Sequence, residues 1–255
     1  MKKLIYLLSI LLLTSCSSEE NNTEDNTPTL PKVTKLTSKH FDTDGNFERS
    51  FTYSYFYNKD GINEKIDAEV KDLRSPIFNR TYTTTIFFKD GRDDYELLEY
   101  TTVDPNLTSY TVKRDFTYTN DMISSIKITN SDDSIYDDTL TYNTKGLVIN
   151  RIYNTRSKRV YNYEYDTQDR LIKSIQTRDR NGNTIETITE FKYLDVLNPF
   201  YNIRTSYAKQ AFRSMKYIRA SINEEVTVEK NEFNLPTKLT YSTNGKITST
   251  RTFEY

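Results

Sequence analysis

The chain has 255 residues, a net charge of −1 and a pI of about 6.0, so its charge gives it no attraction to nucleic acid or to an anionic membrane surface. Hydrophobic residues make up only 35% of the chain, yet 21 Tyr and 13 Phe recur in regular alternation, which a disordered chain would not show. The composition argues against nucleic-acid binding and favours half-buried β-strands rich in Tyr and Thr.

The N-terminus has the layout of a secretion signal. A basic pair precedes an apolar run, residues 4–13, that is too short to span a bilayer. The next residues, Leu13-Thr14-Ser15-Cys16, resemble the lipobox of bacterial lipoproteins, which implies cleavage before Cys16 and transfer of a diacylglycerol to its thiol. Cys16 is the only cysteine, so no disulfide competes for it. We predict a signal peptide at 1–15 and anchoring by palmitate-type acyl chains; the alternative is a secreted protein with a chance cysteine.

A polar segment follows the cysteine. Ser17-Ser18-Glu19-Glu20 is similar to the export signal that sends lipoproteins of the Bacteroidota to the cell surface. Residues 16–32 contain the lipidated cysteine and then a spacer with little apolar content. The prediction is an outer-membrane protein that is held by lipid on Cys16, exposed at the surface, and without a transmembrane helix after processing.

Removal of the signal leaves 255 − 15 = 240 residues, which we assign to the spacer and one β-domain at 33–255. All six glycines lie in turn-like contexts such as Asn244-Gly245, typical of hairpins. The alternation between these turns predicts the following strands: 33–41, 47–57, 62–70, 80–88, 95–103, 110–119, 122–129, 136–142, 147–153, 159–165, 170–177, 184–193, 217–230, 237–242 and 246–255.

A repeat becomes visible when the tyrosine before each turn is aligned. Tyr118, Tyr142 and Tyr165 are 24 and then 23 residues apart, and each leads through a turn into an apolar run. The stretch 163–171, Tyr-Glu-Tyr-Asp-Thr-Gln-Asp-Arg-Leu, resembles the tyrosine-aspartate (YD) repeat of Rhs-type shells and of Bacteroidota lipoproteins, although Asp169 stands where that repeat has glycine. The resemblance implies a sheet of repeated β-hairpins, and 240 residues are too few to form a cargo-enclosing shell.

The predicted fold is therefore all-β: an antiparallel meander of hairpins in a twisted or curled sheet, either barrel-like or a sandwich. Residues 194–216 carry no period-two pattern and predict one short helical or irregular insertion. Such a segment either covers an open end of the sheet or carries function.

The residues for most catalytic chemistries are missing. The only cysteine is assigned to lipid, and His40 is the only histidine, which argues against nucleophilic triads and zinc. We expect no cofactor. An enzyme that uses only Asp and Glu on glycans remains the alternative to a non-enzymatic protein.

Two further features suggest metal binding or modification. Oxygen-rich turns make Asp42, Asp44, Asp132 and Asp133 weak calcium candidates, although none fits the helix–loop–helix pattern. The sequences around Ser134 and Thr139 are similar to the O-glycan acceptor motif of the Bacteroidota.

Two tyrosine rows and one loop are the candidate ligand-binding residues. Alternation places the members of each row on one face of a strand, where they either stack on a sugar or peptide or pack across strands. The candidates are Tyr53, Tyr55, Tyr57, Tyr161, Tyr163, Tyr165, Phe200 and Tyr201. The leading hypothesis is a binding module of the cell envelope for glycan, peptide or another envelope protein, and a purely structural role is a third hypothesis.

Overall fold

The computed structural model describes residues 30–75, 79–89, 92–102, 109–154, 157–180, 183–200 and 217–255, and Pro31–Tyr255 form one compact unit. The regular structure in these residues is all β. Its strands are β1 (Lys35–Phe41), β2 (Phe47–Tyr57), β3 (Asn63–Asp72), β4 (Arg80–Lys89), β5 (Arg92–Thr102), β6 (Tyr110–Thr119), β7 (Met122–Asn130), β8 (Ile135–Tyr142), β9 (Val148–Asn154), β10 (Arg159–Tyr165), β11 (Leu171–Arg180), β12 (Asn183–Leu197), β13 (Tyr217–Ser221), β14 (Glu225–Lys230), β15 (Pro236–Thr243) and β16 (Lys246–Glu254).

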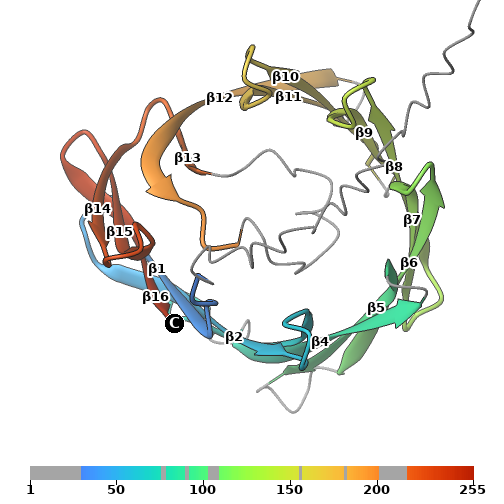
Figure 1. Ribbon diagram of the computed structural model, residues 1–255, viewed down its shortest axis with the longest axis horizontal. Coiled ribbons are helices and arrows are strands. Elements are labelled where there is room, and N and C mark those ends of the chain that lie inside the picture. Colours follow the sequence, from blue (N-terminus) through green and yellow to red (C-terminus); the bar gives the residue numbers. More distant parts are fainter. Residues whose placement is uncertain are drawn as a thin grey trace, which may run out of the picture. The chain divides into compact units, whose positions relative to one another are not determined.

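These strands form one 16-stranded antiparallel sheet that curves into a nearly closed barrel (Figure 1). Apart from β13 and β14, strands that follow one another in the chain are paired, and β1 also pairs with β16, so the first and last strands lie side by side. The two edges are β13 and β14, which follow one another in the chain but are not paired. The predicted meander of hairpins is therefore confirmed, and of the predicted alternatives the sheet adopts the barrel-like form.

Two predicted elements are wrong, and other strand ends differ by up to three residues, as at β5, which begins at Arg92 and not at 95. The segment 217–230 is two strands and not one, because a turn at Ile222–Glu224 interrupts it, closed by a bond from the Glu224 N–H to the Ser221 carbonyl at 3.1 Å. The irregular segment begins later than residue 194, since β12 continues to Leu197. A shift in the register with β13 between Tyr193 and Leu197 breaks the alternation there, which is why the sequence pattern missed this strand end. Residues 201–216 lie outside the described part of the chain.

The inner and outer faces of the sheet can be told apart at its edge. The end of β12 and β13 lie inside the ring formed by the other strands (Figure 1). Ile218 and Ala220 of β13 belong to the same core cluster as Leu239 and Phe253 of β15 and β16, which places the last two side chains on the inner face. Residues directly opposite each other in a pair share a face, so the register carries this assignment from strand to strand.

The buried apolar side chains form two clusters. One covers the inner face of β5 to β9 and includes Leu98, Ile126 and Leu140. The other lies where β12 and β13 pack against β14 to β16 and β1, around Val196 and Leu239. Ala220, which belongs to the second cluster, lies opposite Lys192 in the register. Its side chain is therefore on the same face as that of Lys192, the outer face of β12. The edge formed by the end of β12 and by β13 thus lies inside the barrel, where its apolar side chains pack against the inner face of β15 and β16.

Candidate functional site

Turns with one recurring hydrogen-bond pattern join many of the hairpins. At 166–170 the Asp166 side chain accepts the backbone N–H groups of Gln168 and Arg170, both at 2.9 Å, and Asp169 has a φ of 61°. The same pattern, with glycine or asparagine at positive φ in the fourth position, recurs in the turns that begin at Asp42, Asn58, Asn143 and Asn231. The aspartate of the Tyr-Asp pair is therefore a turn former, a role that asparagine also fills.

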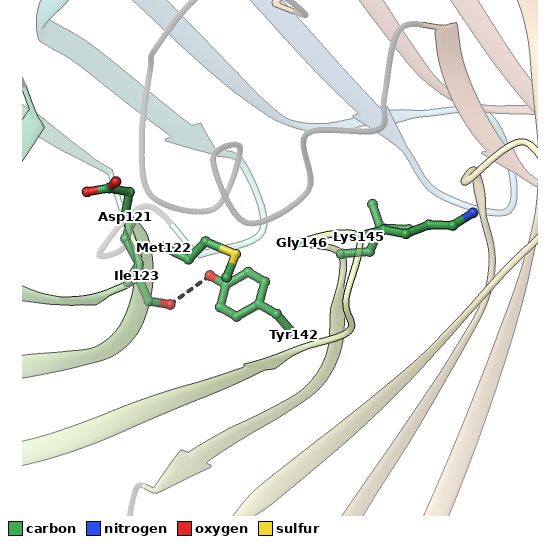
Figure 2. A pocket seen from close by; sticks show the side chains of 7 residues that line it. Asp121, Met122, Ile123, Tyr142, Lys145 and Gly146 are labelled. Atoms are coloured by element: carbon green, nitrogen blue, oxygen red, sulfur yellow. Dashed lines mark hydrogen bonds between the residues drawn. The ribbon is translucent and has the colours of Figure 1, made fainter.

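The tyrosine near such a turn ties one hairpin to the preceding one. The Tyr142 hydroxyl donates to the Ile123 carbonyl at 2.7 Å (Figure 2), and the Tyr165 hydroxyl donates to the Val148 carbonyl at 2.7 Å. The linking tyrosines, as we call them, are Tyr57, Tyr118, Tyr142, Tyr165, Tyr193 and Tyr255, with acceptors 17 to 25 residues earlier in the chain. The repeat length seen in the sequence is thus the length of one hairpin.

A small pocket lies beside one of these links. Its lining includes Met122, Tyr142 and Gly146, and its volume is about 120 Å³ (Figure 2). Small-molecule sites usually occupy roughly 300–1,000 Å³. This pocket is a feature of the turn packing and is too small to be the main candidate site.

The tyrosine rows predicted from the sequence lie on the inner face. Tyr57 and Tyr165, at the ends of the two rows, are linking tyrosines, and burial raises the pKa of both hydroxyls. In the second row the rings of Tyr161 and Tyr163 stack with centroids 6.3 Å apart, and burial raises the pKa of Tyr163 to about 12. The last tyrosine of each row thus has a structural role, and the two preceding positions in each row remain the ligand-binding candidates.

The first row is part of a continuous aromatic belt on the inner face. Ring centroids are 6.5 Å apart for Tyr53 and Tyr82, 5.3 Å for Tyr82 and Tyr100, and 4.3 Å for Tyr100 and Tyr110. The belt runs from β2 to β6, so cross-strand packing accounts for much of this aromatic content. At its other side Tyr55 lies 5.2 Å from the ring of Phe200, which places Phe200 near the first row, whereas Tyr201 lies outside the described residues.

Arginine is the residue type on the inner face that the sequence analysis missed. The register places Arg49, Arg80, Arg114, Arg151, Arg159, Arg178, Arg219 and Arg251 there. Arg159 is in phase with the Tyr161 row, so period-two alternation alone could have placed it. The inner wall therefore combines tyrosine rings with a basic charge.

Three buried carboxylates lie on the same face, and Asp138 and Glu96 each form an ion pair with an arginine. Asp138 is fully buried and accepts bonds from Nε and Nη2 of Arg151 at 2.6 to 3.0 Å. Glu96 is 0% exposed and pairs with Arg114 at 3.1 Å, and Asp93 is 2% exposed on the same strand. With eight arginines and these three acids, together with Asp72 opposite Arg49, cationic groups outnumber anionic groups on the inner face.

Arg219 shows how aromatic side chains surround a cation on the inner face; no ion pair joins it to an acid among the described residues. Its guanidinium lies 4.4 Å from the ring centroid of Phe191. Burial lowers the pKa of Arg219, while the neighbouring Tyr193, Tyr163 and Tyr165 oppose that shift. Ring faces and phenolic oxygens thus stabilise the charge.

The outer face is polar. Ion pairs along the strands join Lys65 to Asp67 at 3.0 Å, Lys173 to Glu164 at 3.1 Å, and several further pairs: Lys35 with Glu254, Lys71 with Glu69, Lys113 with Asp115, and Lys238 with Glu229. A barrel wall in lipid instead presents an apolar band, and each Lys or Arg at its midplane costs about 2–4 kcal/mol. Ion pairs therefore cover much of this outer face, on which single apolar side chains such as Phe56 and Ile188 are also exposed.

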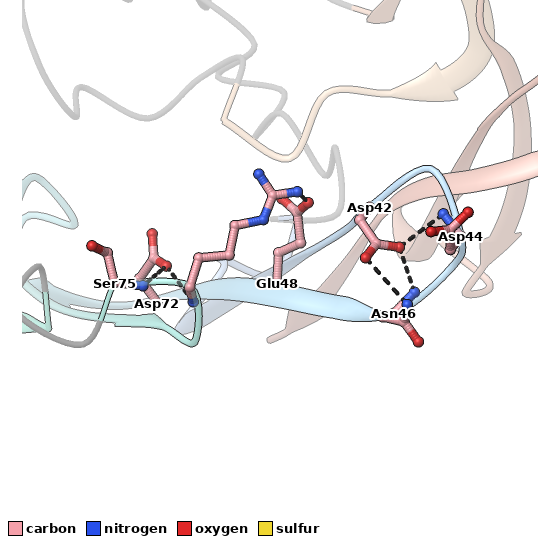
Figure 3. Close-up of polar contacts among 7 residues, drawn as sticks. Asp42, Asp44, Asn46, Glu48, Asp72 and Ser75 are labelled. Atoms are coloured by element: carbon pink, nitrogen blue, oxygen red, sulfur yellow. Dashed lines mark hydrogen bonds and ion pairs between the residues drawn. The ribbon is translucent and has the colours of Figure 1, made fainter.

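The calcium candidates do not come together. Asp42 accepts the N–H groups of Asp44 and Asn46 at 2.8 Å each, which explains why its pKa is lowered (Figure 3). The Asp132 carboxylate accepts from the Ser134 N–H at 3.0 Å, and the neighbouring Asp133 adopts a φ of 60°. Among the residues that the structure describes, no group of three or more His, Cys, Asp or Glu side chains is placed to hold a metal ion.

Other polar contacts lie near the turn that begins at Asp42. Glu48 forms an ion pair with Arg74, and Asp72 accepts the N–H groups of Arg74 and Ser75 at 3.0 Å (Figure 3). These contacts join the start of β2 to the chain that follows β3. The Glu48 and Asp72 carboxylates therefore have structural roles.

The two predicted glycan acceptors lie in different surroundings. The Ser134 hydroxyl donates to Asp132 at 2.6 Å in the turn before β8. Thr139 is exposed on the outer face of β8, opposite Ser125 and Ile152. The lipidation candidate, Cys16, lies outside the described residues. In the part of the chain that is described, no helix is long and apolar enough to cross a membrane.

The fold and the two faces define a class: an all-β, nearly closed meander barrel with a polar outer wall and an aromatic, basic inner wall. No protein-family model and no curated protein matches the sequence. Two porin-like proteins are among the solved structures that are similar to the chain. A porin-like protein from Bacteroides uniformis ATCC 8492 shares 13% identity at a TM-score of 0.54, over 89% of this chain and 98% of that one. A porin-like protein from Bacteroides vulgatus ATCC 8482 shares 14% identity at a TM-score of 0.36, over 88% and 98%. The first likeness identifies the fold.

Proposed function

We propose that the chain is a lipid-anchored, non-enzymatic outer-membrane protein that presents its β-barrel for binding in the cell envelope. The observation that carries the proposal is the polarity of the two walls. Charged pairs cover the outer face, and tyrosine rings and arginines cover the inner face. Because the outer face is charged, attachment of the barrel to a membrane requires a separate anchor, and lipid on Cys16 would provide it.

The sequence supports the same location. The lipobox-like residues 13–16 and the following Ser-Ser-Glu-Glu stretch are typical of surface lipoproteins, and the tyrosine-aspartate turns resemble repeats found in such proteins. The porin-like structure of similar fold comes from Bacteroides. Within this proposal, glycan, peptide and a neighbouring envelope protein are the partners that the inner wall or its rims would meet.

The anchor is tested by Cys16→Ser in the full-length protein expressed in a Bacteroides host. We expect the variant to leave the membrane fraction and lose metabolic labelling with a palmitate analogue, while a Ser15→Ala control stays bound. Protease treatment of intact cells reports surface exposure. Retention of Cys16→Ser in the membrane would refute lipid anchoring.

One observation favours a second function, a carboxylate-dependent glycan-active enzyme. Asp93 and Glu96 are neighbours on the inner face of β5, since they lie opposite Phe88 and Ile86. Residues two apart on a regular strand lie roughly 7 Å apart, and the bulge in β5 inserts one extra residue between Asp93 and Glu96, which gives a separation on the order of the ~5–10 Å between glycosidase carboxyl groups. Both are buried, and Glu96 is paired with Arg114, which favours a structural role. Turnover of a glycan by the purified protein, abolished by Asp93→Asn, would establish the enzyme instead.

A further inference from the structure

Two arginines face each other on the inner wall, and neither forms an ion pair with a described residue. Arg159 of β10 lies directly opposite Arg178 of β11. Their Cβ atoms are therefore roughly 4.5–5.5 Å apart, and like charges in this position destabilise a sheet. The Nε atom of each is buried and has no hydrogen-bond partner, and neither residue takes part in an ion pair within the described residues.

The acid in the same cross-strand row as Arg159 is already paired with another arginine. Asp138 lies opposite Tyr153, which lies opposite Arg159, so the three share one row on the inner face. Both oxygens of Asp138 accept bonds from Arg151 at 2.6 to 3.0 Å. Among the described residues, therefore, no acid is paired with Arg159 or Arg178, and their charge is available to a ligand.

The surroundings of this pair indicate the kind of group. Tyr153 and Tyr161 flank Arg159, and the guanidinium of Arg151 lies 5.7 and 5.8 Å from their ring centroids. The next positions on β11 and β12 are amide or hydroxyl side chains: Gln176, Ser174, Thr187 and Thr189. Two guanidinium forks fit the oxygens of a carboxylate or sulfate, rings can pack on a pyranose face, and the amide and hydroxyl groups can meet sugar hydroxyls.

We infer that Arg159 and Arg178 form the oxyanion subsite of a binding site for an acidic saccharide, one that carries carboxylate or sulfate groups. The inference deepens the proposed binding function and rests on it. A peptide ligand is less well matched, because the described side chains around the pair are mostly rings and polar groups, with Ile185 opposite Arg178 as the apolar exception. Binding neutralises the opposed charges, so it also stabilises the fold.

Isothermal titration of the full-length protein in detergent tests the subsite. The probes are an oligogalacturonate, a chondroitin sulfate oligosaccharide, a neutral cello-oligosaccharide and an oligoglutamate peptide. We expect an acidic saccharide to bind with an affinity that falls as salt rises, and the stronger of the first two to identify the oxyanion. Arg159→Gln with Arg178→Gln should weaken that binding at least tenfold, while the matched inner-face control Arg251→Gln leaves it within twofold.

Thermal unfolding separates a binding role from a structural one. If the arginines bind a ligand, the double variant without ligand unfolds at the same or a higher temperature than the parent, and only the parent is stabilised by the saccharide. A lower unfolding temperature for the ligand-free double variant overturns the inference. Tight binding of only the neutral sugar or only the peptide also overturns the inference, but it leaves the proposed binding function intact. If none of the probes binds, the proposed binding function fails as well.

Discussion

The link between hairpins can be tested by removing one hydroxyl. Tyr165→Phe keeps the ring on the inner face of β10 but loses the donor to the Val148 carbonyl, a bond of 2.7 Å. Val148 is 0% exposed, so water cannot replace that donor without opening the wall. Leaving a buried acceptor unpaired costs about 1–3 kcal/mol. We expect the lower half of this range, because a carbonyl oxygen has a second lone pair.

The assay is equilibrium unfolding in urea, followed by far-UV circular dichroism on full-length protein that carries Cys16→Ser. A loss of 1 kcal/mol corresponds to roughly 2–4 °C in melting temperature for a domain of this size. The matched control is Tyr161→Phe on the same strand and face, whose hydroxyl has no hydrogen-bond partner among the described residues, and its effect should stay within about 0.5 kcal/mol. Equal stability changes in the two variants would contradict the proposed role of the linking tyrosines.

Three further perturbations follow from the same contacts. Phe88 occupies the position of a linking tyrosine, because it lies 25 residues after Asn63, as Tyr118 lies 25 residues after its acceptor, Asp93. Phe88→Tyr should therefore form a bond to the Asn63 carbonyl and add about 1 kcal/mol of stability in urea unfolding. An unchanged or lower stability would show that the position is not equivalent. Burial tends to raise the pKa of Asp166, but hydrogen bonds from Arg170 and Gln168 outweigh burial and lower that pKa below its ordinary value. The stability that Asp166 contributes is therefore fully present above its unfolded-state pKa and is lost as pH falls through its folded-state pKa. Asp166→Asn, which keeps the side-chain acceptor, should reduce the acid sensitivity of stability in unfolding experiments across this range, and an unchanged pH profile would contradict this. Arg151→Met strands the buried Asp138 carboxylate and should cost about 3–5 kcal/mol, most of which the additional change Asp138→Leu should restore in the same unfolding assay; a double variant as unstable as the single one would show that the pair is not what matters.

The hairpins were predictable because their signals are local. Asn244-Gly245 needs positive φ at both positions, and the structure gives 52° and 73°. Alternation in Tyr161 to Tyr165 gave a strand with the observed boundaries. Where a local signal was ambiguous, the prediction failed: residues 222–224 contain no glycine or proline, so two strands were joined into one.

The candidate site was only half predictable. The tyrosine rows stood out in the sequence, but their terminal members, Tyr57 and Tyr165, bond to carbonyls 24 and 17 residues away, a partnership that depends on how hairpins stack. The opposed pair of Arg159 and Arg178 depends on the register of β10 against β11. A shift of one residue would have turned one of them to the outer face.

The sequence by itself determined that the chain is a series of hairpins, because turn geometry and period-two alternation act over a few residues. It also predicts an anchor at Cys16, because the lipobox-like motif is local. Only the tertiary structure decided that β1 closes on β16, that β13 rolls inside the wall, and which side of each strand faces inward. These depend on the summed twist of the whole sheet and on contacts between residues far apart in the chain, such as Leu36 and Phe253, which no local pattern encodes.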